Sequence, residues 1–541
     1  MTEAGPTAAA VAPGAAGAEA IDELALDVLE IAGSPVDAWA VAATLESRGV
    51  RDLDAVERYR RADVFELAEV VFVRCRELQE PIVAPTLEPM PTSLRARRFT
   101  GHFARGAFFF VPLALQMISL VLFGYSQWAW VHFSLSQAST IALSTGASFV
   151  ATAGFVQALG YLGPLFSEPG KHTLTERLTW RWLALALVCS FAFGGLLVGV
   201  NAVLGAYPSG LVEVGIVYYA LLAGLWLANG ILYMLRAYLA MFLATVAGLA
   251  AVVVLREGPG IGIYAAQWIG LGLTIAAALG WATLVLRRRA ANTAGDLRLA
   301  QFPPWRRLRR AATPFFCFGA LYFALILCDR MVGWSAGDHP LPVWFEVRYE
   351  LGLDWALIAV VAGIAFLEHT VEAFSARLEP TQRRFPGHER AAHNKDFLRF
   401  YRHHLAVTLA LSVLGVALAY GGALLLANLG SIGELGDIES YVHGPVTPSV
   451  FAWGAAGYVL LTWGLLNATV LFSVARPWPL VAALAAALAV DLAVGIPLSR
   501  SGPYWHSVIG LTAGCAVFAL LTTVAAVRAL RRADYHFLAA Y

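Results

Sequence analysis

Apolar and polar positions divide the chain into a polar first part and a long series of apolar segments that starts after residue 100. Twelve of these segments are long enough for a helix to cross about 30 Å of hydrocarbon, which takes roughly 20 residues. The pattern therefore predicts an all-α polytopic membrane protein with about 12 transmembrane helices. We expect the spans near residues 104–124, 136–159, 182–205, 213–233, 237–255, 263–286, 314–333, 351–375, 403–427, 448–472, 478–499 and 507–528.

The polar segments between the spans repeat halfway along the chain. A long basic loop, residues 161–181, follows the second span. The loop after the fourth span has a single basic residue, Arg236. The second half repeats this arrangement, with a basic loop at 377–402 after the eighth span and Arg476 alone after the tenth. Such repetition is typical of transporters built from internal repeats, although similar loop lengths also arise by coincidence. We interpret the pattern as two six-helix bundles joined by a basic linker.

The polar first part has the pattern of a small helical unit. The segment Ser34–Asp37 opens an amphipathic helix, because serine caps helices and proline suits their first turn, and Gly49 ends it. Either Asp52 or Asp54 starts a short helix, and Asp63 precedes a longer one with an apolar face at helical spacing. A bundle of about 60 residues is marginally stable alone. It either docks on a partner or on the basic loops, or it only aids folding and insertion.

Together these patterns predict seven segments along the chain. The small N-terminal helical cytoplasmic unit is linked to the first bundle, and a basic segment links the two bundles. The segments are a disordered tail (1–18), an acidic helical cytoplasmic unit (19–80), a proline-rich linker (81–100), the first six-helix bundle (101–287), a basic cytoplasmic linker (288–312), the second six-helix bundle (313–530) and a cytoplasmic tail (531–541).

The distribution of charge orients the spans. The whole chain is nearly neutral, with 38 Lys and Arg against 37 Asp and Glu, which favours neither a nucleic-acid partner nor an acidic one. Residues 1–90 hold 17 acidic and 7 basic groups, so an acidic unit precedes a basic membrane part. On one side 27 basic residues border the spans, whereas the loops on the other side carry only Arg256, Arg348 and Arg500. Because orientation follows Lys and Arg in short loops, we expect both termini in the cytoplasm.

Motifs of soluble enzymes are missing from the sequence. It has no GxxxxGK[ST] phosphate loop, no HExxH helix, no CxxC pair and no GxSxG elbow. Four of the five cysteines lie inside apolar runs, where neither a metal quartet nor a disulfide framework forms. The N-terminus lacks the pattern of a signal peptide, so an internal span targets the chain to the inner (plasma) membrane. We expect no enzyme activity, no catalytic residues, no cofactor and no metal site.

Ionisable side chains within the spans are the remaining candidates for function. Such residues are costly in hydrocarbon and usually face a cavity or one another. Asp491 lies alone in an apolar run, and Glu368 and Glu372 lie one helical turn apart. Paired carboxylates can bind a cation or a proton, or accept hydrogen bonds from sugar hydroxyls. Our candidates for a substrate or ion cavity are Asp329, Arg330, Asp354, Glu368, Glu372 and Asp491.

The same residues also have plainer interpretations. Glu350, one turn before Asp354, and Glu372 fall near predicted helix ends, where interfacial water can surround a carboxylate. Asp329 can simply pair with Arg330 or Arg348. The sequence leaves both interpretations open.

An aromatic run, Phe315–Phe323, continues through Asp329 and Arg330 to Trp334. This stretch resembles the seventh span of the Pel exopolysaccharide transporter family. In that family an acidic-basic pair likewise precedes a tryptophan after an apolar run.

Two further stretches carry the resemblance. The segments Tyr349–Asp354 and Ala365–Phe374 are similar to the eighth span of the same family, from which His369 and Val371 depart. Gly154–Tyr161 resembles the glycine-punctuated end of span two in the wider multidrug, oligosaccharidyl-lipid and polysaccharide exporter superfamily.

The resemblance covers residues 100–530 and implies two six-helix bundles around a central cavity. It implies a transporter that exports or flips a polysaccharide or a lipid-linked oligosaccharide by alternating access, and H⁺ or Na⁺ could drive it through a carboxylate. The partners would be a cytoplasmic glycosyltransferase and other membrane proteins. Two alternatives stay open, a cation-coupled drug or metabolite exporter of the same superfamily, and a membrane-embedded enzyme of envelope assembly that uses outer-loop residues such as His339 and Glu346.

Overall fold

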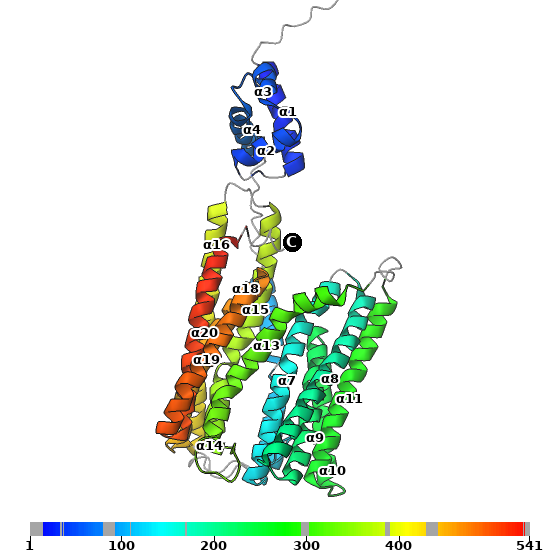
Figure 1. Cartoon of the computed structure of the whole chain (residues 1–541), viewed down its shortest axis with the longest axis vertical. Helices are drawn as coiled ribbons and strands as arrows, with labels where there is room; N and C mark the ends of the chain where they lie inside the picture. Colours follow the sequence, from blue (N-terminus) through cyan, green and yellow to red (C-terminus); the bar gives the residue numbers. More distant parts are fainter. Residues whose placement is uncertain are drawn as a thin grey trace, which may run out of the picture. The chain divides into compact units, whose positions relative to one another are not determined.

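Helices make up nearly all regular structure in the described part of the chain, where one isolated bridge joins Tyr125 to Trp130 (Figure 1). The all-α fold class expected from the sequence is therefore confirmed. The computed structural model describes residues 15–32, 35, 37–78, 92–108, 110–167, 170–293, 302–384, 390–428, 442–533 and 535.

The chain divides into two compact units. The first comprises Met1–Arg98, Ala373–Arg402 and Arg528–Tyr541. The second comprises Phe99–Glu372 and His403–Val527, and it contains nearly all of the membrane-length helices.

Four helices form the N-terminal part of the first unit, namely α1 (Ala15–Ala32), α2 (Ala38–Ser47), α3 (Asp52–Tyr59) and α4 (Val64–Leu78). The three helices expected between residues 34 and 80 are present. The cap of α2 is Asp37, whose carboxylate accepts a hydrogen bond from the Ala40 backbone N–H at 2.9 Å, whereas the expected cap, Ser34, lies outside the described residues. α1 begins at Ala15, inside the segment 1–18 that the sequence indicated to be a disordered tail, because alanine favours helix.

α1, α2 and α4 bury their apolar faces against one another. Leu45, Leu67 and Val71 lie in the centre of this small core. At its edge, Arg74 donates two hydrogen bonds to the Asp22 carboxylate and so ties α4 to α1. The hydrogen bond from Arg74 lowers the pKa of Asp22 below its ordinary value. A compact core and one ion pair thus stabilise the unit.

Eleven helices among the described residues are long and apolar enough to cross a membrane, and the number is twelve if one bent pair counts as a single span. That pair is α5 (Thr92–Phe108) and α6 (Val111–Phe123), which are bent by 52°. Pro112 in the first turn of α6 fits this break, since proline is tolerated in a first turn but has no backbone N–H to continue a helix from the preceding turn. The twelve spans expected from the sequence are confirmed by length and composition.

The two bundles follow one another along the chain. The first bundle continues with α7 (Leu135–Ser167), α8 (His172–Leu204), α9 (Ser209–Met234), α10 (Tyr238–Glu257) and α11 (Ile263–Ala291). The second bundle contains α13 (Trp305–Trp334), α14 (Val347–Ala359), α15 (Val361–Arg384), α16 (Arg390–Asn428), α18 (Val446–Ser473), α19 (Trp478–Ser501), the 3-10 helix η3 (Tyr504–His506) and α20 (Ser507–Leu530).

Several helices extend beyond the hydrophobic segments. The segment 161–181, which hydropathy indicated to be a long loop, is mostly helical, because α7 runs to Ser167 and α8 begins at His172. The eighth span consists of two helices, α14 and α15, that separate at Val360. Hydropathy reports which residues suit hydrocarbon, whereas a helix continues for as long as its backbone hydrogen bonds are made.

α7 and α13 form the main contact between the bundles, which lie side by side in Figure 1 and diverge toward the end that carries α14. Small residues let the two helices approach closely. Gly154 packs on the ring of Phe316, and a Cβ added to Gly319 would lie 2.6 Å from the Ala153 carbonyl oxygen. A side chain at Gly319 would therefore force the bundles apart.

A second contact joins the bundles at one end. There a Cβ added to Gly106 of α5 would lie 2.5 Å from the Ala365 carbonyl oxygen of α15. Nearby, Arg236, in the turn between α9 and α10, pairs with Glu372 of α15 at 3.5 Å. These contacts hold α15 of the second bundle against α5 and the α9–α10 turn of the first.

The core of the N-terminal helices predicts a position-dependent effect of one substitution. Val71→Ala removes methyl groups from a side chain that is 0% exposed, so we expect local unfolding of α4 to become easier by about 1–3 kcal/mol. Val73→Ala on the same helix is the matched control, because Val73 is 52% exposed. Hydrogen exchange of α4 in the full chain measures both. Equal acceleration in the two variants would contradict the described core.

Candidate functional site

Asp329 and Arg330 lie near the end of α13 and point into the second bundle. Asp329 is 0% exposed and Arg330 is 7% exposed. Burying a charge is costly unless it is paired and hydrogen-bonded, so the partners of these two side chains decide how the bundle is built.

Arg330 connects three helices. Its Nε donates to Glu350 of α14 at 3.1 Å, and its guanidinium also donates to the Ile326 carbonyl oxygen of α13 at 2.7 Å. The same guanidinium reaches the hydroxyl of Tyr458 on α18 at 3.3 Å. The carboxylate of the preceding residue, Asp329, lies 3.9 Å from the Arg330 guanidinium. Arg330 is therefore held by one carboxylate, one carbonyl and one phenol at the junction of α13, α14 and α18.

Asp329 is held by a chain of hydroxyl groups. Tyr349 of α14 donates to Asp329 Oδ2 at 2.6 Å, and Ser507 at the start of α20 donates to the Tyr349 hydroxyl at 2.9 Å. Asp329 Oδ1 has no hydrogen bond among the described residues. One oxygen of this buried carboxylate is thus hydrogen-bonded, and the other lies 3.9 Å from the Arg330 guanidinium.

Asp491 lies in the middle of α19, the helix that packs along α13. It is 0% exposed, and neither of its carboxylate oxygens is hydrogen-bonded among the described residues. Its nearest polar neighbours are the Cys328 thiol and Asp329, both on α13. A Cβ added to Gly510 of α20 would lie 2.6 Å from Asp491 Oδ1, so a glycine here lets α20 close over the carboxylate.

Asp354 lies on α14, one turn beyond Glu350, and its side chain is exposed. Residues four apart share a helix face, so Asp354 extends the side of α14 that meets Arg330. The next residue, Trp355, packs against Ala427 of α16. Asp354 thus adds an exposed carboxylate beside the buried charges of Glu350 and Arg330.

Glu368 and Glu372 lie apart from this group. Glu372 pairs with Arg236, and Glu368 lies near Tyr233 at the end of α9. Both carboxylates therefore belong to the contact between the two bundles. The structure brings four of the six predicted cavity residues together and separates these two.

The grouped side chains have an excess of negative charge. The carboxylates of Asp329, Glu350 and Asp354 interact with the single guanidinium of Arg330, and Asp491 lies next to Asp329, so the four acids and one arginine have a formal charge of three negative when all are ionised. Such a site favours a bound proton or small cation. No group of three or more His, Cys, Asp or Glu side chains with metal-binding geometry occurs among the described residues.

Sequence reasoning missed the tyrosines of this site. Tyr349 and Tyr458 are fully buried, and their hydroxyls carry the contacts of Asp329 and Arg330. The position of Tyr349 directly before Glu350 was an available signal. Tyr458 lies in an apolar run with no such signal, because only the packing of α18 on α14 brings it to Arg330.

The first bundle has a neutral polar core at a comparable place. Gln116 and Gln127 hydrogen-bond at 2.9 Å, Gln127 donates to Thr274 at 2.7 Å, and Gln267 pairs with Tyr218. These side chains are amides and hydroxyls, so they are satisfied without any ion. The charged site of the described part of the membrane unit therefore lies in the second bundle.

Outer-loop residues that an enzyme could use are only partly assembled. His339 lies 3.7 Å from Glu346. Asp437 and Glu439 lie outside the described residues.

No family model matches this chain, and no curated protein sequence matches it. Several solved transporter structures have a similar fold. A MATE protein in the straight conformation matches with a TM-score of 0.54 at 12% identity, over 80% of this chain and 96% of that one. The Vibrio cholerae MATE transporter VcmN in its bent form matches with a TM-score of 0.54 at 15% identity, over 82% and 99%.

A MOP superfamily transporter from Pyrococcus furiosus matches with a TM-score of 0.55 at 15% identity, over 80% of this chain and 96% of that one. At such low identity the likeness establishes the fold alone. About four fifths of this chain therefore has a fold like that of these transporter structures.

Proposed function

We propose that this protein is a cation-coupled secondary transporter of the inner membrane that works by alternating access, with both termini in the cytoplasm. The observation that carries the proposal is Asp491, a fully buried carboxylate to which no nitrogen or oxygen donor among the described residues hydrogen-bonds, and whose neighbours on α13 are the Cys328 thiol and Asp329. A buried carboxylate of this kind costs several kcal/mol unless it takes up a proton or a cation. Occupancy of the site therefore bears directly on how α13 and α19 pack.

Coupling in this proposal acts through helix packing. A proton or Na⁺ between Asp329 and Asp491 removes the repulsion between the two carboxylates and draws α13 and α19 together. Because α13 also packs on α7 of the first bundle, a shift of α13 changes the contact between the bundles. A cation that binds one arrangement more tightly shifts the equilibrium by that difference in affinity.

The substrate we favour is a polysaccharide or a lipid-linked oligosaccharide, exported or flipped as in Pel-type exopolysaccharide export. The support comes from the resemblance of the seventh and eighth spans, which supply Asp329, Arg330 and Asp354. Carboxylate and guanidinium groups suit sugar hydroxyls. A cytoplasmic glycosyltransferase that supplies the chain would be the natural partner.

A cation-coupled drug exporter is the second candidate. The solved structures of similar fold are called MATE transporters, and the exposed carboxylate of Asp354 suits a cationic substrate. A knockout separates the two candidates, because it either lowers one cell-surface polymer or raises sensitivity to toxic cations.

Asp491→Asn is expected to abolish export without lowering the amount of protein in the membrane. Asparagine keeps the size of the side chain but cannot exchange a proton or neutralise a cation. The measurement is sugar analysis of cell-surface polymer, or toxic-cation sensitivity, in a deletion strain carrying each variant. Asp338→Asn, an exposed residue just after α13, is the matched control and should export normally. Undiminished export in Asp491→Asn would remove this residue from the mechanism.

Two acids one turn apart on α14 are expected to differ in role. Glu350→Gln removes the only carboxylate to which Arg330 hydrogen-bonds among the described residues, so it should destabilise the purified protein by about 1–3 kcal/mol. Asp354→Asn should lower export and leave the thermal midpoint unchanged, because Asp354 is exposed. A thermal-shift assay and the export assay on both variants test this. Equal destabilisation would place Asp354 in the structural ion-pair network instead.

A further inference from the structure

A cavity among the described residues lies in the first bundle, whereas Asp491 belongs to the second. It measures about 560 Å³ and is bounded by α5, the turn between α9 and α10, the first turn of α10 and the last turns of α11. The candidate transport site uses none of its lining residues. All of them belong to the second compact unit.

The lining of the cavity changes from cationic to apolar along α11. Arg289 lies in the last turn of this helix, and Trp281 lies eight residues earlier, about 12 Å deeper at 1.5 Å per residue. Val285 lies between them, and Leu239 of α10 forms the facing wall. A guanidinium at one end and a hydrocarbon-like surface at the other match an amphiphile with an anionic head.

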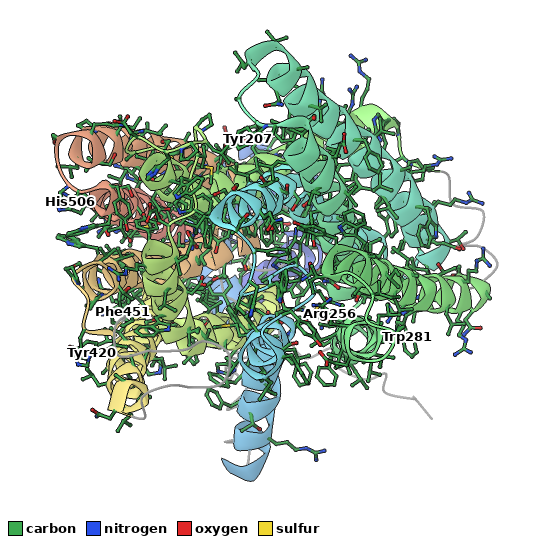
Figure 2. All side chains as sticks on the ribbon, turned by 90° about the horizontal axis from the view of Figure 1, so that it is seen from below. Tyr207, Arg256, Trp281, Tyr420, Phe451 and His506 are labelled. Atoms are coloured by element: carbon green, nitrogen blue, oxygen red, sulfur yellow. The ribbon has the colours of Figure 1, made fainter. Side chains whose placement is uncertain are left out.

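The cavity is open toward the surface that faces the bilayer. Trp281 is 48% exposed and Leu239 is 63% exposed, although both are large and apolar. Figure 2 labels Trp281 near the rim of the first bundle. Exposed apolar side chains in a membrane protein of this kind contact lipid, so a lipid chain can enter the cavity from the side.

The charge at the mouth of the cavity is positive. Arg236 and Arg289 line it, and the neighbouring carboxylate is Glu372, which pairs with Arg236. Arg289 is exposed and has no ion-pair partner among the described residues. The Arg236 guanidinium is thus paired with a carboxylate, whereas the Arg289 guanidinium is available to bind an anionic group. The basic loops around this end also predict that it faces the cytoplasm, where anionic lipids are concentrated.

We propose that this cavity binds one anionic phospholipid of the cytoplasmic leaflet, with its phosphate at Arg289 and an acyl chain along Val285 and Trp281. α5 forms one wall just before the break that precedes α6, so a bound lipid also holds the inner half of the first span against the bundle. The proposal concerns lipid binding alone and does not depend on the transported substrate.

The test compares lipids bound to the purified full chain by native mass spectrometry in micelles that contain phosphatidylglycerol and phosphatidylcholine. We expect one tightly retained phosphatidylglycerol, and we expect Arg289→Gln to weaken its retention about fivefold, the effect of one arginine near a membrane surface. Arg288→Gln is the matched control, because this exposed neighbour on the same helix end does not line the cavity. Arg289→Lys should keep most of the binding.

A second variant tests the apolar part of the site. Ala104→Trp on α5 fills the cavity without changing its charge, so it should also displace the retained lipid. Inorganic phosphate added at millimolar concentration should not compete, since it has no acyl chain. Equal loss of lipid in Arg288→Gln and Arg289→Gln would overturn the proposal, as would no preference for phosphatidylglycerol or full competition by phosphate.

Discussion

The burial of Arg330 is the constraint on which the second bundle depends. A guanidinium cannot lose its proton in a protein, so its charge must be met by partners wherever it is buried. Here the partners come from three helices, with Glu350 on α14, Tyr458 on α18 and a carbonyl of α13 itself. The junction of these helices is therefore fixed by charge as well as by apolar packing. Asp329 and Tyr349 extend the same network to the start of α20.

This arrangement leaves the two bundles unequal, although loop lengths indicate that they are repeats. The first bundle fills its polar core with neutral groups such as Gln116, Gln127 and Thr274, which satisfy one another. The second bundle places an unpartnered acid, Asp491, beside one that is half satisfied, Asp329. Two buried acids with unsatisfied oxygens do not stabilise a fold. This inequality is the physical reason why we propose ion coupling in the second bundle.

Hydropathy predicted the spans well because each one must satisfy its backbone within about 30 Å of hydrocarbon. The same logic identified Asp329, Arg330 and Asp491, since charges stand out in apolar runs. Hydropathy did not distinguish these three residues from Glu368 and Glu372. A spacing of four residues shows that two side chains share a helix face, but it does not show which helix packs against that face. Hydropathy also missed Tyr458, since a tyrosine in an apolar run is unremarkable until α18 packs on α14. The bend between α5 and α6 and the helical ends of α7 and α8 likewise depend on local backbone bonding that hydropathy does not sense.

The central claim is that Asp491 and Asp329 form a cation site, and ligand-dependent stability tests it most directly. The thermal midpoint of the purified full chain would be measured against Na⁺ concentration at several pH values, with choline as the control cation, for the unaltered protein and for Asp491→Asn. A ligand that binds only the folded state raises stability by RT ln(1 + [L]/Kd). The account predicts that Na⁺ or added protons stabilise the unaltered protein and that this response is lost in Asp491→Asn. An identical response in both proteins would contradict the account.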